Sequence, residues 1–207
     1  MTYVVGLTGG IACGKSNLTA ALRSDGAKVI DADEISRALT APGAAALPAL
    51  RAAFGGGVFD GETLDRRALA RLVFSDESAM KTLNGILHPM VFDEMHKQLD
   101  ALKAENTPVV FLDVPLLFET GLNSWCDEVW CAYLPKDGQV RPLIDRDGLT
   151  RAEAEIKVAG QMSGFQKKKL SDRVIDTRSS RENSAAVVLS MYHTLLETLN
   201  AQKEKPL

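Results

Sequence analysis

The chain has 207 residues, 45% of them hydrophobic and 25% charged, which is typical of a soluble globular protein and excludes collagen-like, low-complexity and disordered classes. Its formal net charge of -3 argues against a dedicated nucleic-acid-binding protein, which usually carries a basic excess. Its three cysteines form no C-x-x-C pair and no apolar run reaches the about 18 residues of a membrane span, so we expect a cytoplasmic protein with reduced thiols and no zinc or membrane contact.

Short apolar runs alternate with helical patterns from the N-terminus onward. Residues 3–7 form a β-branched apolar run closed by glycines, which predicts a buried strand, and the apolar spacing that follows Lys15 predicts a helix. Further strands are predicted at residues 28–31, 109–115, 128–134 and 173–176. This alternation predicts an α/β fold with a doubly wound, five-stranded parallel sheet, whose core comprises residues 1–34, 108–140 and 173–207.

The segment between the second and third strands, residues 35–107, shows helical periodicity and no convincing strand. It is too long for a simple crossover, so we predict an inserted helical subdomain with helices at residues 44–54, 65–74 and 80–105. Pro89 interrupts the longest of these patterns, so a kink or a new helix start is expected near His88. For His88 we favour a capping or packing role over catalysis.

A phosphate-binding loop is predicted where the first strand meets the first helix. Gly9 and Gly14 are four residues apart and are followed by Lys15 and Ser16, which completes the pattern G-x-x-x-x-G-K-[ST]. Glycines allow successive backbone N–H groups to turn inward around phosphate oxygens, Lys15 adds positive charge, and the Ser16 hydroxyl is suited to bind Mg²⁺. The predicted nucleotide-binding residues are Gly10, Ile11, Ala12, Cys13, Gly14, Lys15, Ser16 and Asn17, with ATP as phosphoryl donor.

Three aspartates follow predicted strands at the carboxyl edge, where open α/β sheets bind ligands. Asp31 and Asp33 end the second strand, and either could orient an acceptor hydroxyl and take its proton. The alternative is that they cap the following helix, which we favour for Asp31 but not for Asp33. Asp113 ends the third strand, where a role in organising Mg²⁺ and a plain hydrogen-bonding role stay equally open.

Residues 141–172 are rich in cations and predict a helical lid. Closing such a segment over ATP would exclude water and add positive charge near the transferred group. Arg146 is the candidate for that role, whereas for the other cations a solvated helix face is favoured; these are Arg141, Arg151, Lys157, Lys167, Lys168, Lys169 and Arg173. Capping boxes predict helices from Thr150 to about residue 162, and from Ser179 onward.

Taken together, these motifs resemble the dephospho-coenzyme A kinase family nearly from end to end. The resemblance rests on the phosphate loop and its preceding strand, on Ile30-Asp31-Ala32-Asp33, and on further segments at residues 64–69, 73–75, 83–89, 113–119, 146–147 and 161. It implies transfer of the ATP γ-phosphate to the ribose 3′-hydroxyl of dephospho-coenzyme A, a small-molecule acceptor held by the helical insertion. It also implies catalytic roles for Asp33 as base, Lys15 and Arg146, and an acceptor pocket lined by Asp33, Arg37, Leu116, Leu117, Phe118 and Glu119.

The chain departs from the family pattern at several positions. Ala12 and Cys13 replace a usual glycine and serine, which we expect the loop to tolerate because it binds through backbone N–H groups, although Cys13 could make ATP binding sensitive to oxidation. Pro142 replaces an arginine, which we expect to disturb the helix and to let Arg141 substitute from a shifted position. Thr177 replaces a frequent asparagine.

Two other functions remain open on the sequence. One is a nucleoside or nucleoside-monophosphate kinase on the same core, and the other is a nucleotide-binding regulator that has lost catalysis, to which Pro142 lends weight. A switch GTPase is disfavoured because the guanine-reading pattern N-K-x-D is absent. The oligomeric state is not predicted.

Overall fold

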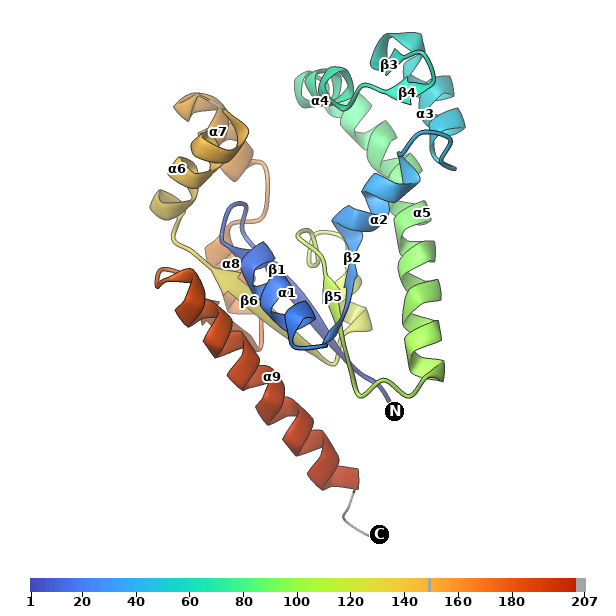
Figure 1. The fold of residues 1–207 in the computed structure, drawn as a ribbon. Helices are drawn as coiled ribbons and strands as arrows, with labels where there is room; N and C mark the ends of the chain where they lie inside the picture. The colour runs from blue at the N-terminus through green and yellow to red at the C-terminus, as the bar shows by residue number, and fades with distance from the viewer. Residues whose placement is uncertain (149, 204–207) are drawn as a thin grey trace. The chain divides into compact units, whose positions relative to one another are not determined.

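The computed structural model describes residues 1–148 and 150–203 of the chain (Figure 1). The main sheet contains β1 (Tyr3–Gly9), β2 (Lys28–Asp31), β5 (Val109–Asp113), β6 (Glu128–Tyr133) and β7 (Arg173–Asp176) in the order β2-β5-β1-β6-β7. The sheet is parallel, and β1 pairs with both β5 and β6 at its centre. The predicted five-stranded parallel sheet is therefore confirmed.

Helices cover both faces of this sheet. Residues of α1 (Lys15–Ser24) and α9 (Arg181–Lys203), including Leu18, Leu22 and Val188, pack into one core cluster with Val5, Leu7 and Phe111 of the sheet. Because side chains alternate along a strand, Thr8 faces the opposite side, where α8 (Gly164–Leu170) contacts β1 and β6 (Figure 1). The 3-10 turn η2 (Leu122–Trp125) precedes β6, and α6 (Lys136–Asp147) and α7 (Arg151–Ala159) lie between β6 and α8.

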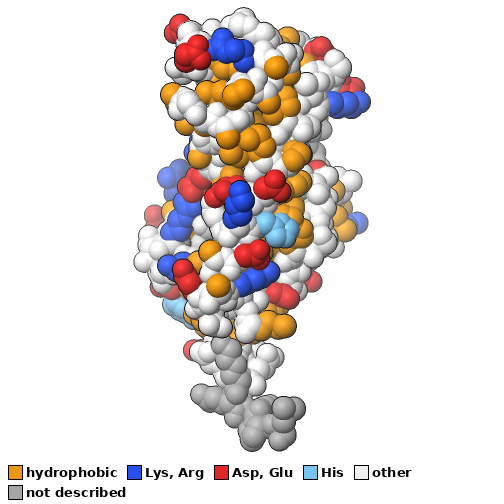
Figure 2. Space-filling model, turned by 90° about the vertical axis from the view of Figure 1, so that its right-hand side faces the viewer, with side chains coloured by type: hydrophobic (Ala, Val, Ile, Leu, Met, Phe, Trp, Pro, Cys, Tyr) orange, Lys and Arg blue, Asp and Glu red, His pale blue; other side chains and the backbone are white. Residues whose placement is uncertain are grey.

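The chain divides into two compact units: Met1–Ile30 with the described residues from Leu102 onward, and Asp31–Ala101. The second unit contains α2 (Ala32–Leu39), α3 (Leu47–Phe54), η1 (Gly56–Val58), α4 (Arg66–Ser75) and most of α5 (Glu77–Ala104). Its buried core includes Leu47, Leu50, Leu69 and Val73. Figure 2 shows hydrophobic side chains gathered on the part of the surface that this unit forms; its exposed large hydrophobic residues include Leu72 and Phe74.

Three local predictions in the second unit and the lid need correction. The insertion does contain strands, β3 (Phe59–Asp60) and β4 (Thr63–Leu64), which form a hairpin too short to produce a readable alternation. No new helix starts at Pro89, because α5 continues from Glu77 to Ala104 with buried residues on both sides of the proline. Pro142 likewise lies inside an unbroken α6. Packing therefore outweighs the local cost of about 3 kcal/mol for an internal proline.

The helix boundaries near the lid also differ from the expectation. Thr150 caps α7 with Glu153 as predicted, but α7 ends at Ala159, and a second capping box at Ser163 and Gln166 starts the separate helix α8. At the start of α9 the Ser180 hydroxyl, rather than that of Ser179, accepts the Asn183 N–H at 3.2 Å. Within residues 1–148 and 150–203, no helix combines the length and the apolar character that crossing a membrane requires.

Candidate active site

The phosphate loop links Gly9, the last residue of β1, to Lys15, the first residue of α1. Gly14 has φ +81°, a left-handed conformation that a side chain would strain. Gly9 must lack a side chain for a different reason, since a Cβ there would lie 2.5 Å from Cys13 Sγ and 2.6 Å from the Ala132 carbonyl oxygen. The two glycines that define the motif are thus required by backbone conformation and by close packing.

Ala12 also adopts a left-handed conformation, with φ +55°. For an L-residue with a Cβ this region costs about 1–2 kcal/mol relative to the right-handed one. The loop keeps its shape but holds strain at Ala12, and the expected tolerance of ATP binding to this alanine stays a prediction.

A buried ion pair lies behind the loop. Lys15 Nζ binds Asp113 Oδ1, and the Thr19 hydroxyl donates to Asp113 Oδ2 at 2.5 Å. Asp113 is 1% exposed, so both of its oxygens are satisfied inside the protein. Thr19 was not predicted from the sequence, although it lies one helical turn after Lys15 and so shares its face of α1.

Thr177 fixes the loop from the side of β7. Its hydroxyl lies 2.7 Å from the Cys13 carbonyl oxygen and 3.0 Å from the Tyr133 carbonyl oxygen. The Asn17 side chain donates to the Arg181 carbonyl oxygen at 2.9 Å, which joins the first turn of α1 to the start of α9. The sequence marked Thr177 only as a replaced asparagine, because a contact across 164 positions leaves no local pattern.

Cys13 is buried, and burial is the main cause of the raised pKa of its thiol. A buried neutral thiol is a poor nucleophile, so the structure disfavours the oxidation sensitivity that the sequence suggested. The neighbouring thiol of Cys131 has its pKa raised to about 11, again mainly by burial. Both cysteines act as small packing residues.

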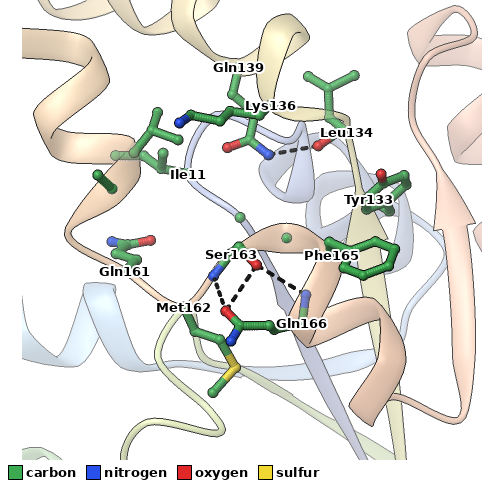
Figure 3. Close-up of a pocket in the computed structure, with 14 residues that line it drawn as sticks. Ile11, Tyr133, Leu134, Lys136, Gln139, Gln161, Met162, Ser163, Phe165 and Gln166 are labelled. Carbon is green, nitrogen blue, oxygen red and sulfur yellow. Dashed lines mark hydrogen bonds between the residues drawn. The ribbon is translucent and has the colours of Figure 1, made fainter. Parts of the chain in front are cut away.

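Two hollows adjoin the phosphate loop. One of about 330 Å³ is lined by Gly14, Ser16, Asn17, Thr177, Ser179, Arg181 and Ser184. The other, of about 400 Å³, lies between Gly10 and Ile11 of the loop and residues of α6, α7 and α8 (Figure 3). In it the Gln139 amide donates to the Leu134 carbonyl oxygen at 2.6 Å, and Gln161 Oε1 is a buried oxygen without a partner among the described residues. The loop thus has space for a ligand on both sides.

The loop fits a phosphate group with an associated Mg²⁺. The Ser16 hydroxyl is exposed in the first turn of α1, where the helix end favours anions, and the Asp113 carboxylate lies behind the loop. Among the described residues no cluster of three or more His, Cys, Asp or Glu side chains could hold a metal by itself. Mg²⁺ is commonly held by one or two protein ligands together with substrate phosphates, and Ser16 is the candidate ligand here.

Arg146, the predicted lid residue, is exposed near the end of α6. Its guanidinium donates twice to Asp147, at 2.7 Å and 3.1 Å, and Lys157 of α7 lies 3.2 Å from the same carboxylate. These contacts, with the Arg146 hydrogen bond first, lower the pKa of Asp147 to about 2. Arg141 is exposed on the unbroken α6, so its position is not shifted by a helix disruption at Pro142.

The acceptor candidates of the second unit lie on α2. Asp31 caps this helix by accepting the N–H groups of Asp33 at 2.8 Å and Glu34 at 3.0 Å, as the sequence favoured. Asp33 follows in the first turn and is exposed, and Arg37 is exposed four residues later. This spacing places Asp33 and Arg37 on the same face of α2.

The segment after β5 carries the other acceptor candidates. Leu116 and Phe118 are half-buried, and Glu119 Oε1 accepts the Met162 N–H at 3.2 Å. Leu117 is fully buried, and a Cβ at Gly6 would lie 2.8 Å from it, so its side chain packs in the core, and its predicted lining role stays a prediction. Lys167 also contradicts its expected solvated position, because it is 0% exposed and binds Glu119 Oε1 at 2.9 Å.

The doubly wound parallel sheet and the phosphate loop between β1 and α1 define a nucleotide-binding protein of the P-loop class. A sequence model of dephospho-CoA kinase matches residues 3–183. The chain therefore belongs to the dephospho-CoA kinase family.

Individual relatives agree with this assignment. The chain is 43% identical over 193 residues to a dephospho-CoA kinase from Geobacillus kaustophilus, covering 92% of this chain and 96% of that protein. A crystal structure from Thermus thermophilus superposes with a TM-score of 0.79 at 34% identity, covering 94% of this chain and 98% of the other. A dephospho-CoA kinase structure from Campylobacter jejuni gives a TM-score of 0.71 at 25% identity, covering 96% and 99%.

Proposed function

We propose that this chain transfers the γ-phosphoryl group of ATP to the ribose 3′-hydroxyl of dephospho-coenzyme A, giving coenzyme A and ADP. The observation that carries the proposal is the family match over residues 3–183 together with a complete phosphate loop. The family match also speaks against a regulator without catalysis, whereas an intact phosphate loop is needed for ATP binding in either case.

On the donor side, the residues that bind ATP are the loop residues from Gly10 to Asn17. Their backbone N–H groups hold the phosphates, and the Lys15 ammonium group, which Asp113 holds at the loop, contacts the outer phosphate oxygens. Ser16 would hold Mg²⁺, with Asp113 as the nearby carboxylate, and the ion would neutralise charge on the phosphate oxygens. Because these groups are held before the reaction, little reorganisation is needed at the transition state.

On the acceptor side, Asp33 orients the 3′-hydroxyl and takes its proton, and Arg37 on the same face of α2 binds the acceptor. The half-buried Leu116 and Phe118, with Glu119, contribute the part of the acceptor pocket that follows β5. Arg146 leaves Asp147 to stabilise charge on the transferring group, and residues 141–172 act as a lid that excludes water.

The test is an ADP-release assay with Mg-ATP and dephospho-coenzyme A, with adenosine, AMP and CMP as competing acceptors. We expect turnover with dephospho-coenzyme A to exceed turnover with adenosine, AMP or CMP. Phosphorus NMR should locate the new phosphate on the 3′-oxygen. Higher turnover with a nucleoside or nucleotide acceptor would favour a nucleoside or nucleoside-monophosphate kinase. ATP binding without any ADP release would instead indicate a nucleotide-binding regulator that has lost catalysis.

A further inference from the structure

Lys167 is the one lysine among the largest fully buried side chains of the described structure. A lysine side chain loses its hydration on burial, and it stays charged inside a protein only where a counter-ion and hydrogen-bond acceptors replace the water. Its neighbours Lys168 and Lys169 on α8 show the ordinary alternative, since both are exposed and lie over the aromatic rings of Tyr133 and Phe165. The position of Lys167 therefore calls for an explanation that its neighbours do not need.

The ammonium group of Lys167 has two acceptors. It lies 2.9 Å from Glu119 Oε1 and also donates to the Pro115 carbonyl oxygen. Both acceptors belong to the segment that follows β5, one at its start and one four residues later. Lys167 therefore binds this segment at two points and fixes its course between them.

Each acceptor is shared with another part of the active site. The Pro115 carbonyl oxygen also accepts the Thr8 hydroxyl at 3.1 Å, and Thr8 immediately precedes the first glycine of the phosphate loop. Glu119 Oε1 also accepts the Met162 N–H at 3.2 Å, and Met162 lies between α7 and α8, beside the hollow shown in Figure 3. The ammonium group thus joins, through these shared acceptors, the strand entering the phosphate loop, the segment after β5 and the turn between α7 and α8.

We propose that Lys167 is a positioning residue for phosphoryl transfer, which holds residues 115–119 in place for the acceptor by binding Pro115 and Glu119 from inside the protein. This inference rests on the proposed function, because Leu116, Phe118 and Glu119 are the acceptor-lining residues that it would position. Lys167 itself touches neither substrate, since its side chain is 0% exposed.

The experiment compares Lys167→Met with the matched control Lys169→Met, which removes the same charge from an exposed site on the same helix. We expect Lys167→Met to raise the KM for dephospho-coenzyme A by about tenfold or more, within the range that a displacement of about 1 Å can cost. The KM for ATP should change less than about threefold, because the loop contacts of Lys15 and Thr177 remain. Lys169→Met should behave as the unmodified enzyme.

Several results would overturn the proposal. Unchanged kinetics in a folded Lys167→Met enzyme would show that the ion pair between Lys167 and Glu119 has only a structural role. A rise confined to the KM for ATP would show that Lys167 positions the ATP-binding residues and not the acceptor-lining residues. The unmodified enzyme is assayed first. If it does not phosphorylate dephospho-coenzyme A, the proposed function itself has failed; if it does, the variants test Lys167 alone.

A second set of variants covers the case in which Lys167→Met does not fold. Glu119→Gln keeps an acceptor oxygen for Lys167 while removing the charge, and Lys167→Arg keeps the charge. If Lys167 acts through Glu119, the effects of Lys167→Arg and Glu119→Gln on the acceptor KM are coupled, so the double variant shows less than the product of the single effects. Independent, multiplying effects would contradict the proposal.

Discussion

The phosphate loop and the residues proposed to act on the transferred group are held in opposite ways. Behind the loop, Lys15, Thr19 and Asp113 form buried contacts, and Thr177 binds a loop carbonyl. Asp33 and Arg146, by contrast, are exposed on helices, and Arg146 is held by an exposed ion pair. Exposed pairs contribute about 0–1 kcal/mol, whereas breaking a buried pair costs about 3–5 kcal/mol. The donor site is therefore already formed in the folded protein, whereas Asp33 and Arg146 can change partners when substrates bind.

The largest effect should come from Lys15→Met, which removes a cation from the contacts behind the phosphate loop. We expect phosphoryl transfer to fall by about 10²–10³-fold, because a preorganised cation at the phosphates is lost. Stability should fall as well, by about 3–5 kcal/mol, since Asp113 is left buried with Thr19 alone. Turnover and urea unfolding measure the two losses, and the exposed Lys28→Met is the control. A stable Lys15→Met enzyme would mean that the ion pair does not support the fold.

Asp33→Asn tests the exposed side and should separate activity from stability. Turnover should fall by about 10²–10⁴-fold because the base is lost, while the unfolding free energy and ATP affinity stay nearly unchanged. Titration calorimetry with ATP and the ADP-release assay check this, with the adjacent exposed Glu34→Gln as control. Normal turnover in Asp33→Asn would reassign the base, with Asp31 as the next candidate.

Arg146→Met should lower turnover by about 10²-fold with little change in stability, because its present partner is an exposed carboxylate. The matched variant is Arg141→Met on the same helix. If the losses are reversed, with Arg141→Met the more damaging, Arg141 has taken the role that the sequence pattern assigns to Arg146.

Thr177→Val removes the hydroxyl that binds the Cys13 and Tyr133 carbonyl oxygens. We expect a stability loss of about 1–2 kcal/mol and a rise of about three- to tenfold in the KM for ATP, with the acceptor KM unchanged. Thr177→Ser, which keeps the hydroxyl, should restore both values. Equal KM for ATP in all three enzymes would show that the loop holds its shape without this contact.

The smallest effect is expected for Ala12→Gly, which relieves the left-handed strain at φ +55° but gives the unfolded chain more freedom. The net gain should be below about 1 kcal/mol and is measured as a shift in the urea midpoint. Asn106→Gly is a matched comparison, because Asn106 has φ +57° and asparagine tolerates this region better. A clear loss of stability in Ala12→Gly would mean that the Cβ makes contacts that outweigh the strain.

The sheet and the phosphate loop could be predicted because their signals are local. The β-branched run before Gly9 and the motif ending at Ser16 each occupy a few consecutive residues, and the capping box at Thr150 spans four. The new helix start that was one expectation at Pro89, and the disturbed helix expected at Pro142, do not occur because buried neighbours on the same helices override the proline penalty. The alternative at Pro89, a kink, stays a prediction.

The residues that support the site could not be predicted in the same way. Thr177 and Lys167 reach partners 164 and 52 positions away along the chain, so only the folded sheet brings them together. Lys167 in particular lies in a run of three lysines, and nothing in such a run indicates which member is buried.

The hydrogen bond from Thr177 to the Cys13 carbonyl oxygen also determines how the loop meets an anion. In a planar trans peptide the carbonyl and the following N–H point in opposite directions. Anchoring the Cys13 oxygen toward β7 therefore turns the Gly14 N–H the other way. One hydroxyl beside the edge strand β7 thus fixes the direction of a peptide dipole in the phosphate loop, with its N–H end turned away from that hydroxyl.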